Sequence, residues 1–134
     1  VAAGGEYGVE ENMPALAGKN LLLGKIVKVF DGYSEVKSIF SSDWQLPVKI
    51  GQTGVDGLLI GGPNPTVTMI VYEKDISAGE EVYSASKDFP YGLKIGEIKS
   101  VNAGSSNFFK EASLNFSYDF NNLLEVLIYA PDAP

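Results

Sequence analysis

The side chains that could do chemistry in this sequence are carboxylates, lysines, tyrosines and serines, because its 134 residues include no His and no Cys. Without Cys there is no thiol nucleophile, disulfide or thiolate metal site, and without His there is no Ser-His-Asp triad and no imidazole ligand. Catalysis would therefore have to use carboxylates or a serine activated by a lysine. We expect no metal site and no cofactor.

Seven acidic residues are candidates for a pair of catalytic carboxylates, the arrangement with which many glycoside hydrolases cleave their substrates. They are Asp31, Asp43, Asp56, Asp75, Glu80, Glu81 and Asp88. Most of them fall in predicted turns or at strand ends, where solvated acids are the simpler interpretation. Ser86 and Lys87 could pair as nucleophile and base, but adjacent residues on a strand point to opposite faces. The sequence therefore assigns no catalytic residue.

The acidic balance of the chain argues against two classes of partner. The formal net charge is -7 and the pI is about 4.5. Nucleic acids and anionic membrane surfaces are bound mainly through cationic protein surface, so neither is an expected partner. The aromatic content of 11% is more than a small core needs. Trp44 is predicted to be core, whereas Tyr91, Phe108 and Phe109 lie in predicted loops and could serve either the core or a protein contact.

The elements that must position these side chains are predicted to be strands. Fifteen Gly and seven Pro divide the sequence into short segments that alternate or are rich in β-branched and aromatic residues, which is typical of an all-β fold. Nine strands are predicted, at 22–30, 34–40, 46–50, 55–60, 66–72, 81–85, 93–101, 112–118 and 125–130. Short helices are predicted only at 107–111 and 120–124, the second with Asp119 as its N-cap.

Local patterns refine this picture. Asp31-Gly32 is typical of a tight hairpin turn, and in the segment 66–72 the alternation predicts that Val67, Met69 and Val71 share one face. The segments Leu23–Val29 and Ile95–Val101 both read apolar-Gly-charged-Ile-x-x-Val. Two related strands, each bent at a Gly, would fit two small barrels, although chance is an equally good explanation because strands draw on a small alphabet.

A long motif at Phe89-Pro90-Tyr91-Gly92-Leu93-Lys94-Ile95-Gly96-Glu97-Ile98 reads F-P-x-G-L-x-[VI]-G-x-[VI]. Further motifs follow the same order along the chain, at Gly8–Ala15, Leu22–Val29, Tyr33–Val36, Pro47–Ile50, Gly57–Gly61, Gly79–Val82 and Leu123–Ile128. Together they resemble the MreC family of bacterial rod shape-determining proteins over nearly the whole chain. Ser84-Ala85-Ser86 replaces the usual T-S-G, Lys87-Asp88 replaces a Gly-containing pair, and Leu22 occupies a usual Gly.

The resemblance implies two small β-barrels, the second inserted into the first. We expect residues 1–22 and 76–134 to form the first barrel, and residues 23–75 to form the inserted one. It also implies a location outside the cytoplasmic membrane, in the periplasm or on the cell-wall side. An N-terminal transmembrane anchor and a coiled coil would be missing, which agrees with a chain that begins at Val1 rather than Met.

The function implied by the resemblance is that of a non-enzymatic scaffold of peptidoglycan elongation, which maintains cell shape. Such a scaffold would bind a class B penicillin-binding protein and MreD, couple to MreB filaments inside the cell, and self-associate. The candidate partner-binding residues are Phe89, Pro90, Tyr91, Leu93, Phe108 and Phe109.

Two alternatives of different classes stay open. A carboxylate-based glycan hydrolase would need two acids facing one cleft about 5–10 Å apart. A glycan-binding β-domain would present a flat row of exposed aromatic side chains.

Overall fold

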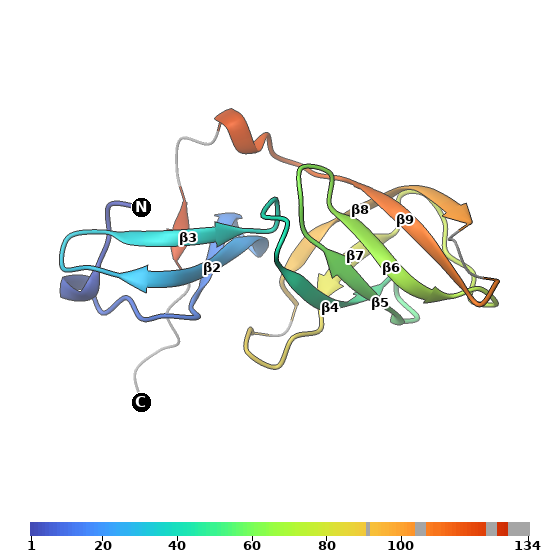
Figure 1. The fold of residues 1–134 in the computed structure, drawn as a ribbon, viewed down its shortest axis with the longest axis horizontal. Coiled ribbons are helices and arrows are strands. Elements are labelled where there is room, and N and C mark those ends of the chain that lie inside the picture. The colour runs from blue at the N-terminus through green and yellow to red at the C-terminus, as the bar shows by residue number, and fades with distance from the viewer. Residues whose placement is uncertain (91, 104–106, 123–125, 129–134) are drawn as a thin grey trace. The chain divides into compact units, whose positions relative to one another are not determined.

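The computed structural model describes residues 1–90, 92–103, 107–122 and 126–128 (Figure 1). The elements run in the order η1 (Gly5–Tyr7), β1 (Pro14–Gly18), β2 (Leu21–Val29), β3 (Ser34–Ser38), β4 (Gln45–Ile50), β5 (Val55–Ile60), β6 (Thr66–Val71), β7 (Glu81–Ser84), β8 (Lys94–Ala103), β9 (Phe109–Asn115), η2 (Phe120–Asn122) and β10 (Leu127–Ile128). The chain forms two compact units, and the second interrupts the first. The predicted all-β fold class is confirmed. Of the two predicted small barrels, the inserted unit is a closed barrel, whereas the described strands of the other unit form an antiparallel sheet.

The inserted unit, Ile39–Ser117, contains a closed barrel of six antiparallel strands. Each strand pairs with two neighbours in the circular order β4-β5-β6-β9-β8-β7, and β7 returns to β4 (Figure 1). Closure satisfies the backbone hydrogen bonds of both edges of every strand. Ligands and partners of this unit are therefore recognised by side chains, loops and strand ends.

Alternation of side chains builds the core of this barrel. In β4, Leu46, Val48 and Ile50 are buried, whereas the residues between them are exposed. This is the period of two that a half-buried strand requires. The other strands add a matching set of buried side chains, which includes Leu59, Val67, Ile70, Val82, Ile95 and Ile98.

The other unit comprises Val1–Ser38 and Tyr118–Pro134. Its described strands form an antiparallel sheet in the order β10-β1-β2-β3. The predicted turn at Asp31-Gly32 is confirmed, since the amide of Phe30 donates to the carbonyl of Tyr33 at 2.8 Å across it. Leu22 and Ile26 are fully buried on one side of β2.

The bounds of the two units differ from those expected from the sequence, 1–22 with 76–134 and 23–75. β3 stays with β2 in the discontinuous unit because the two strands form one hairpin with five register pairs. β7, β8 and β9 belong to the inserted unit because they complete the ring that β4, β5 and β6 begin. The inserted unit therefore runs from 39 to 117.

Three local predictions were wrong or incomplete. Val67 is buried but Met69 and Val71 are exposed, because a bulge between Val67 and Ile70 places Met69 at φ 57° and reverses the alternation. The segment predicted as a helix at 107–111 instead enters β9 at Phe109. β1 was not predicted, since Pro14–Gly18 is rich in small residues.

The second predicted helix, at 120–124, is represented by η2, and residues 123 and 124 lie outside the described residues. The predicted cap is present, because the Asp119 carboxylate accepts a hydrogen bond from the amide of Asn121 at 3.0 Å.

The two similar segments of the sequence occupy β2 and β8 and are irregular at the same positions. The pairing of β2 with β1 skips Leu23, and the pairing of β8 with β7 skips the matching Ile95. On the other side, pairing with the following strand skips Val27 in β2 and the matching Lys99 in β8. The similarity therefore extends to backbone geometry.

The shared glycines allow a close approach of the next strand. A Cβ atom at Gly24 would lie against the backbone of Lys37 in β3, 2.8 Å from its carbonyl carbon. At Gly96 it would lie 2.7 Å from the carbonyl oxygen of Asn115 in β9. Only a residue without a side chain fits between backbones at this spacing.

Candidate functional site

The acidic residues considered for hydrolysis lie toward solvent. Every carboxylate in the described part of the chain is at least partly exposed. Lys94 Nζ contacts Glu97 at 3.1 Å and Glu81 at 3.4 Å. The hydrogen bond to Glu97 is the main reason that the pKa of Lys94 is raised, while partial burial opposes the rise. These two acids therefore take part in an exposed ion-pair cluster. Among the described residues, no group of three Asp or Glu could hold a metal ion.

The six predicted contact residues are not all on the surface. Phe89 and Leu93 are buried, with 8% and 3% exposure, and the ring of Phe89 meets that of Trp44 edge-on at 6.4 Å between centroids. The burial of Trp44 confirms its assignment to the core. Pro90 is half-buried, and Tyr91 lies outside the described residues.

The other two members, Phe108 and Phe109, lie together at the start of β9. Phe109 is half-buried, while Phe108 is 76% exposed. Phe89 and Leu93 thus contribute core packing, and among the described members of the set Phe108 is the most exposed.

Phe108 belongs to a group of exposed apolar residues at one end of the barrel. Met69, Val71 and Tyr72 at the end of β6 are 53%, 44% and 56% exposed. The amide of Tyr72 donates to the carbonyl of Phe108 at 2.9 Å, which continues the β6–β9 pairing and brings the two aromatic residues opposite each other. We call Met69, Val71, Tyr72 and Phe108 the β6 surface. Exposed apolar residues that are neighbours on paired segments in this way favour a protein contact.

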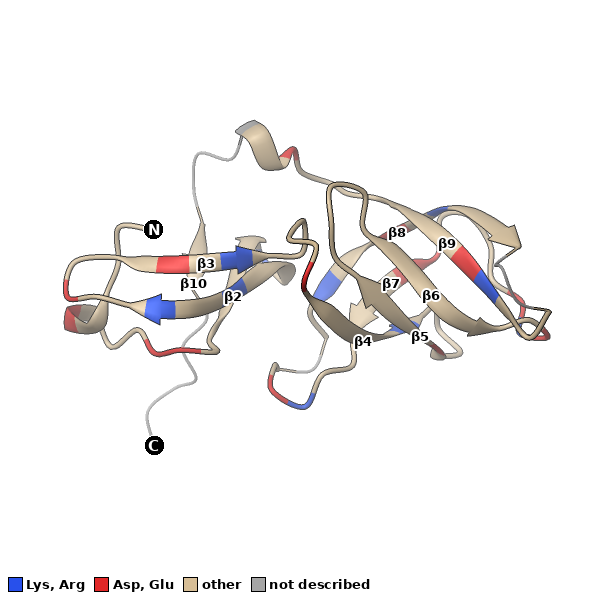
Figure 2. Ribbon diagram, viewed as in Figure 1, with Lys and Arg blue, Asp and Glu red and all other residues tan. Residues whose placement is uncertain are grey.

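Charged groups border the β6 surface. Lys110 Nζ lies 5.8 Å from the ring centroid of Tyr72, a position that favours a cation–π interaction. Adjacent basic (blue) and acidic (red) segments lie on β9 (Figure 2). Met69 and Val71 also line a groove of about 430 Å³ that extends to residues 53–56, 74 and 75. An apolar centre with a polar rim is the usual composition of a binding surface.

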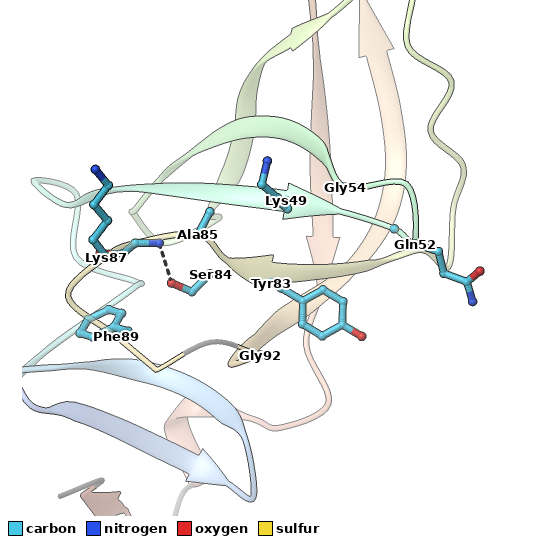
Figure 3. Close-up of a pocket in the computed structure, with 11 residues that line it drawn as sticks. Lys49, Gln52, Gly54, Tyr83, Ser84, Ala85, Lys87, Phe89 and Gly92 are labelled. Carbon is cyan, nitrogen blue, oxygen red and sulfur yellow. Dashed lines mark hydrogen bonds between the residues drawn. The ribbon is translucent and has the colours of Figure 1, made fainter. Parts of the chain in front are cut away.

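A larger groove lies beside β7, and we call it the β7 groove. Its volume is about 670 Å³, and it is bounded by the end of β4, the turn that follows β4, β7 itself and the segment after β7 (Figure 3). Tyr83 and Phe89 stand on opposite sides of it, with Ser84 and Ala85 between them (Figure 3). This groove was not predicted from the sequence. The sequence features that could have indicated the groove are the two turn glycines, Gly51 and Gly54, and the small residues after β7, which line it together.

No helix in the described part of the chain has the length and apolar character needed to cross a membrane.

Comparison with known proteins gives a consistent result. The sequence pattern of the family described as rod shape-determining protein MreC, barrel core, matches residues 1–130. No curated protein sequence gives a significant match.

Three solved structures illustrate the similarity of fold. MreC from Listeria monocytogenes superimposes with a TM-score of 0.85 at 20% identity, covering 95% of this chain and 64% of that one. The complex between penicillin-binding protein PBP2 and MreC from Helicobacter pylori gives 0.69 at 24% identity, covering 90% and 79%. The major periplasmic domain of a cell shape-determining filament, MreC, gives 0.73 at 25% identity, covering 93% and 80%.

Proposed function

Because the chain belongs to the MreC family of rod shape-determining proteins, we propose that it is a non-enzymatic scaffold of the machinery that elongates the cell wall. The family match over residues 1–130 carries this proposal. The scaffold acts outside the cytoplasmic membrane, where it binds a class B penicillin-binding protein. It associates with MreD and with further copies of itself, and is coupled to MreB filaments inside the cell.

Two of the compared structures support the choice of partner and compartment. The Helicobacter pylori relative was solved in complex with PBP2, and another relative is described as a periplasmic domain of a filament. The acidic, His-free and Cys-free composition is in keeping with a module that other proteins recognise.

We assign the penicillin-binding protein contact to the β6 surface. Large aromatic side chains dominate binding energy when a partner covers them, and Tyr72 and Phe108 are two exposed aromatic residues whose backbones are hydrogen-bonded to each other. Because the barrel is closed, a partner at this end meets side chains and the β8–β9 end rather than an open strand edge.

The test is binding of the purified chain to the extracytoplasmic region of the matching penicillin-binding protein, measured by calorimetry. Phe108→Ala should weaken binding by tenfold or more, in line with a hot-spot loss of about 1.4 kcal/mol or above. Tyr7→Ala is the matched control, since Tyr7 is an aromatic residue with 73% exposure in the other unit. This variant should bind as the parent does.

The possible failures are distinguishable. If the parent chain neither binds the penicillin-binding protein nor self-associates in sedimentation at high concentration, the scaffold proposal is wrong. If the parent binds but Phe108→Ala and Tyr7→Ala behave alike, the β6 surface is the wrong assignment while the partner stands.

A further inference from the structure

Three glycines form part of the wall of the β7 groove. Gly51, Gly54 and Gly92 adopt φ values of 69°, 68° and 90°, a region that side chains disfavour. At Gly92, an added Cβ would meet no atom within 4 Å. The backbone therefore leaves open space at Gly92, whereas a Cβ at Gly51 would meet the Glu80 carboxylate and one at Gly54 would lie 3.5 Å from Cδ of Lys49.

Two lysines, Lys49 and Lys87, are the charged side chains among the described residues that line the groove, although the chain as a whole carries -7. The carboxylates of Glu80 and Glu81 lie just outside this lining, the first beside Gly51 and the second in a hydrogen bond from the Tyr83 hydroxyl. Lys49 Nζ pairs with Asp56 Oδ1 at 2.5 Å, but the side chains are 48% and 81% exposed. An ion pair this exposed is weak and can exchange for another carboxylate. Lys87 is also exposed.

The remaining lining is suited to an apolar side chain. The rings of Tyr83 and Phe89 flank the small side chain of Ala85 (Figure 3). The hydroxyl of Ser84 accepts a hydrogen bond from the amide of Ser86 at 3.2 Å, so one polar group of the wall is already satisfied. Concave apolar lining with a few polar groups at the rim is typical of a ligand site.

We propose that the β7 groove binds an extended acidic peptide segment of a partner protein. One apolar side chain of the peptide occupies the space between Tyr83 and Phe89, and neighbouring carboxylates meet Lys49 and Lys87. An extended peptide suits this arrangement because its alternate side chains point in opposite directions and can serve the apolar wall and the basic rim together. The site is independent of the β6 surface and does not require the proposed scaffold function.

The experiment uses two peptide pools and the ¹⁵N-labelled chain. Each pool contains octapeptides in which Leu, Phe, Trp or Tyr alternates with a charged residue, Asp or Glu in the first pool and Lys or Arg in the second. The acidic pool should shift the amide resonances of Gly51, Gln52, Gly54 and Gly92, and the basic pool should leave them in place. The shifts should shrink as salt is raised to 1 M, where the screening length falls to about 3 Å.

A second experiment reverses the charge of a lysine that lines the groove. For the tightest acidic peptide, Lys87→Glu should weaken binding about tenfold, because one exposed attraction is replaced by a repulsion. Lys99→Glu is the matched control, since Lys99 is an exposed lysine of β8 that does not line the groove. Both variants should give the dispersed spectrum of the parent.

Four outcomes would overturn the proposal. Both pools could leave the four amides unshifted, or shift them equally. Lys87→Glu and Lys99→Glu could weaken binding to the same extent. Phosphatidylglycerol vesicles could bind the parent and bind Lys87→Glu less well, while the acidic peptides bind neither protein. The ligand would then be a lipid phosphate and not a peptide.

Discussion

Replacement of Gly24 by Ala should destabilise the β2–β3 hairpin, because the new methyl group has no room. Its Cβ would lie against the carbonyl of Lys37 and 2.8 Å from the Cα of Ser38, both of them backbone. Overpacking of this kind costs about 1–3 kcal/mol. Displacing β3 weakens one or two ladder hydrogen bonds, at about 1 kcal/mol each. The smaller conformational freedom of the unfolded chain with Ala opposes this loss by about 0.4–1 kcal/mol, so the free energy of unfolding should fall by about 1–4.5 kcal/mol.

Gly32→Ala is the matched control in the same hairpin. A Cβ atom at Gly32 would meet no atom within 4 Å, so the free energy of unfolding should stay the same or rise by up to about 1 kcal/mol. Urea unfolding should be followed by far-ultraviolet circular dichroism together with hydrogen exchange of the β3 amides. Fluorescence alone would not suffice, because the single Trp, Trp44, belongs to the other unit.

A Gly24→Ala variant that unfolds within about 0.5 kcal/mol of the parent, with its β3 amides still protected, would contradict this prediction. In that case the hairpin can shift its register or separation without cost, and the close approach at Gly24 is not a structural requirement. A loss of the same size in Gly32→Ala would also contradict it, since both effects would then reflect the loss of a flexible residue rather than crowding.

Two further substitutions test the packing of aromatic side chains. Phe89→Ala should lower the free energy of unfolding by about 3–5 kcal/mol, because it removes a buried ring that contacts Trp44. The fluorescence emission of Trp44 should shift to the red. A loss of stability below about 1 kcal/mol would instead indicate that Phe89 is a surface residue. Burial raises the pKa of Tyr118 above its ordinary value of about 10, so the stability that its neutral form provides is complete below pH 10 and is lost as the pH rises further. Tyr118→Phe should show a smaller alkaline loss in urea unfolding, and a parallel pH profile in both proteins would refute this.

Much of the fold followed from local patterns in the sequence. Alternation in β4, with Leu46, Val48 and Ile50 buried, needed no knowledge of the partner strands. The Asp31-Gly32 turn and the Asp119 cap were equally local, because each depends on the conformational preference of one or two residues. The glycines of the two similar segments also had a structural meaning, since both strands admit a neighbouring backbone there.

The candidate surfaces were predicted less well, and the reason is physical. The exposure of Phe108 and the burial of Phe89 could not be separated by sequence, because both are aromatic residues in segments with loop-like composition. The exposure of Met69 depends on a bulge in β6, which is set by pairing with β9 some forty residues later in the chain. Composition gives the number of aromatic side chains but does not show which of them face the core and which face solvent.

The sequence by itself determined that the chain is all-β, that it has no His or Cys chemistry, and that it resembles one family throughout its length. These properties depend on residue type and on spacing within short segments. Only the tertiary structure decided that β7, β8 and β9 close the barrel begun by β4–β6, and that small residues of distant segments enclose a basic groove. Both features arise from pairing between residues far apart in the chain, where local preference carries no information about the partner.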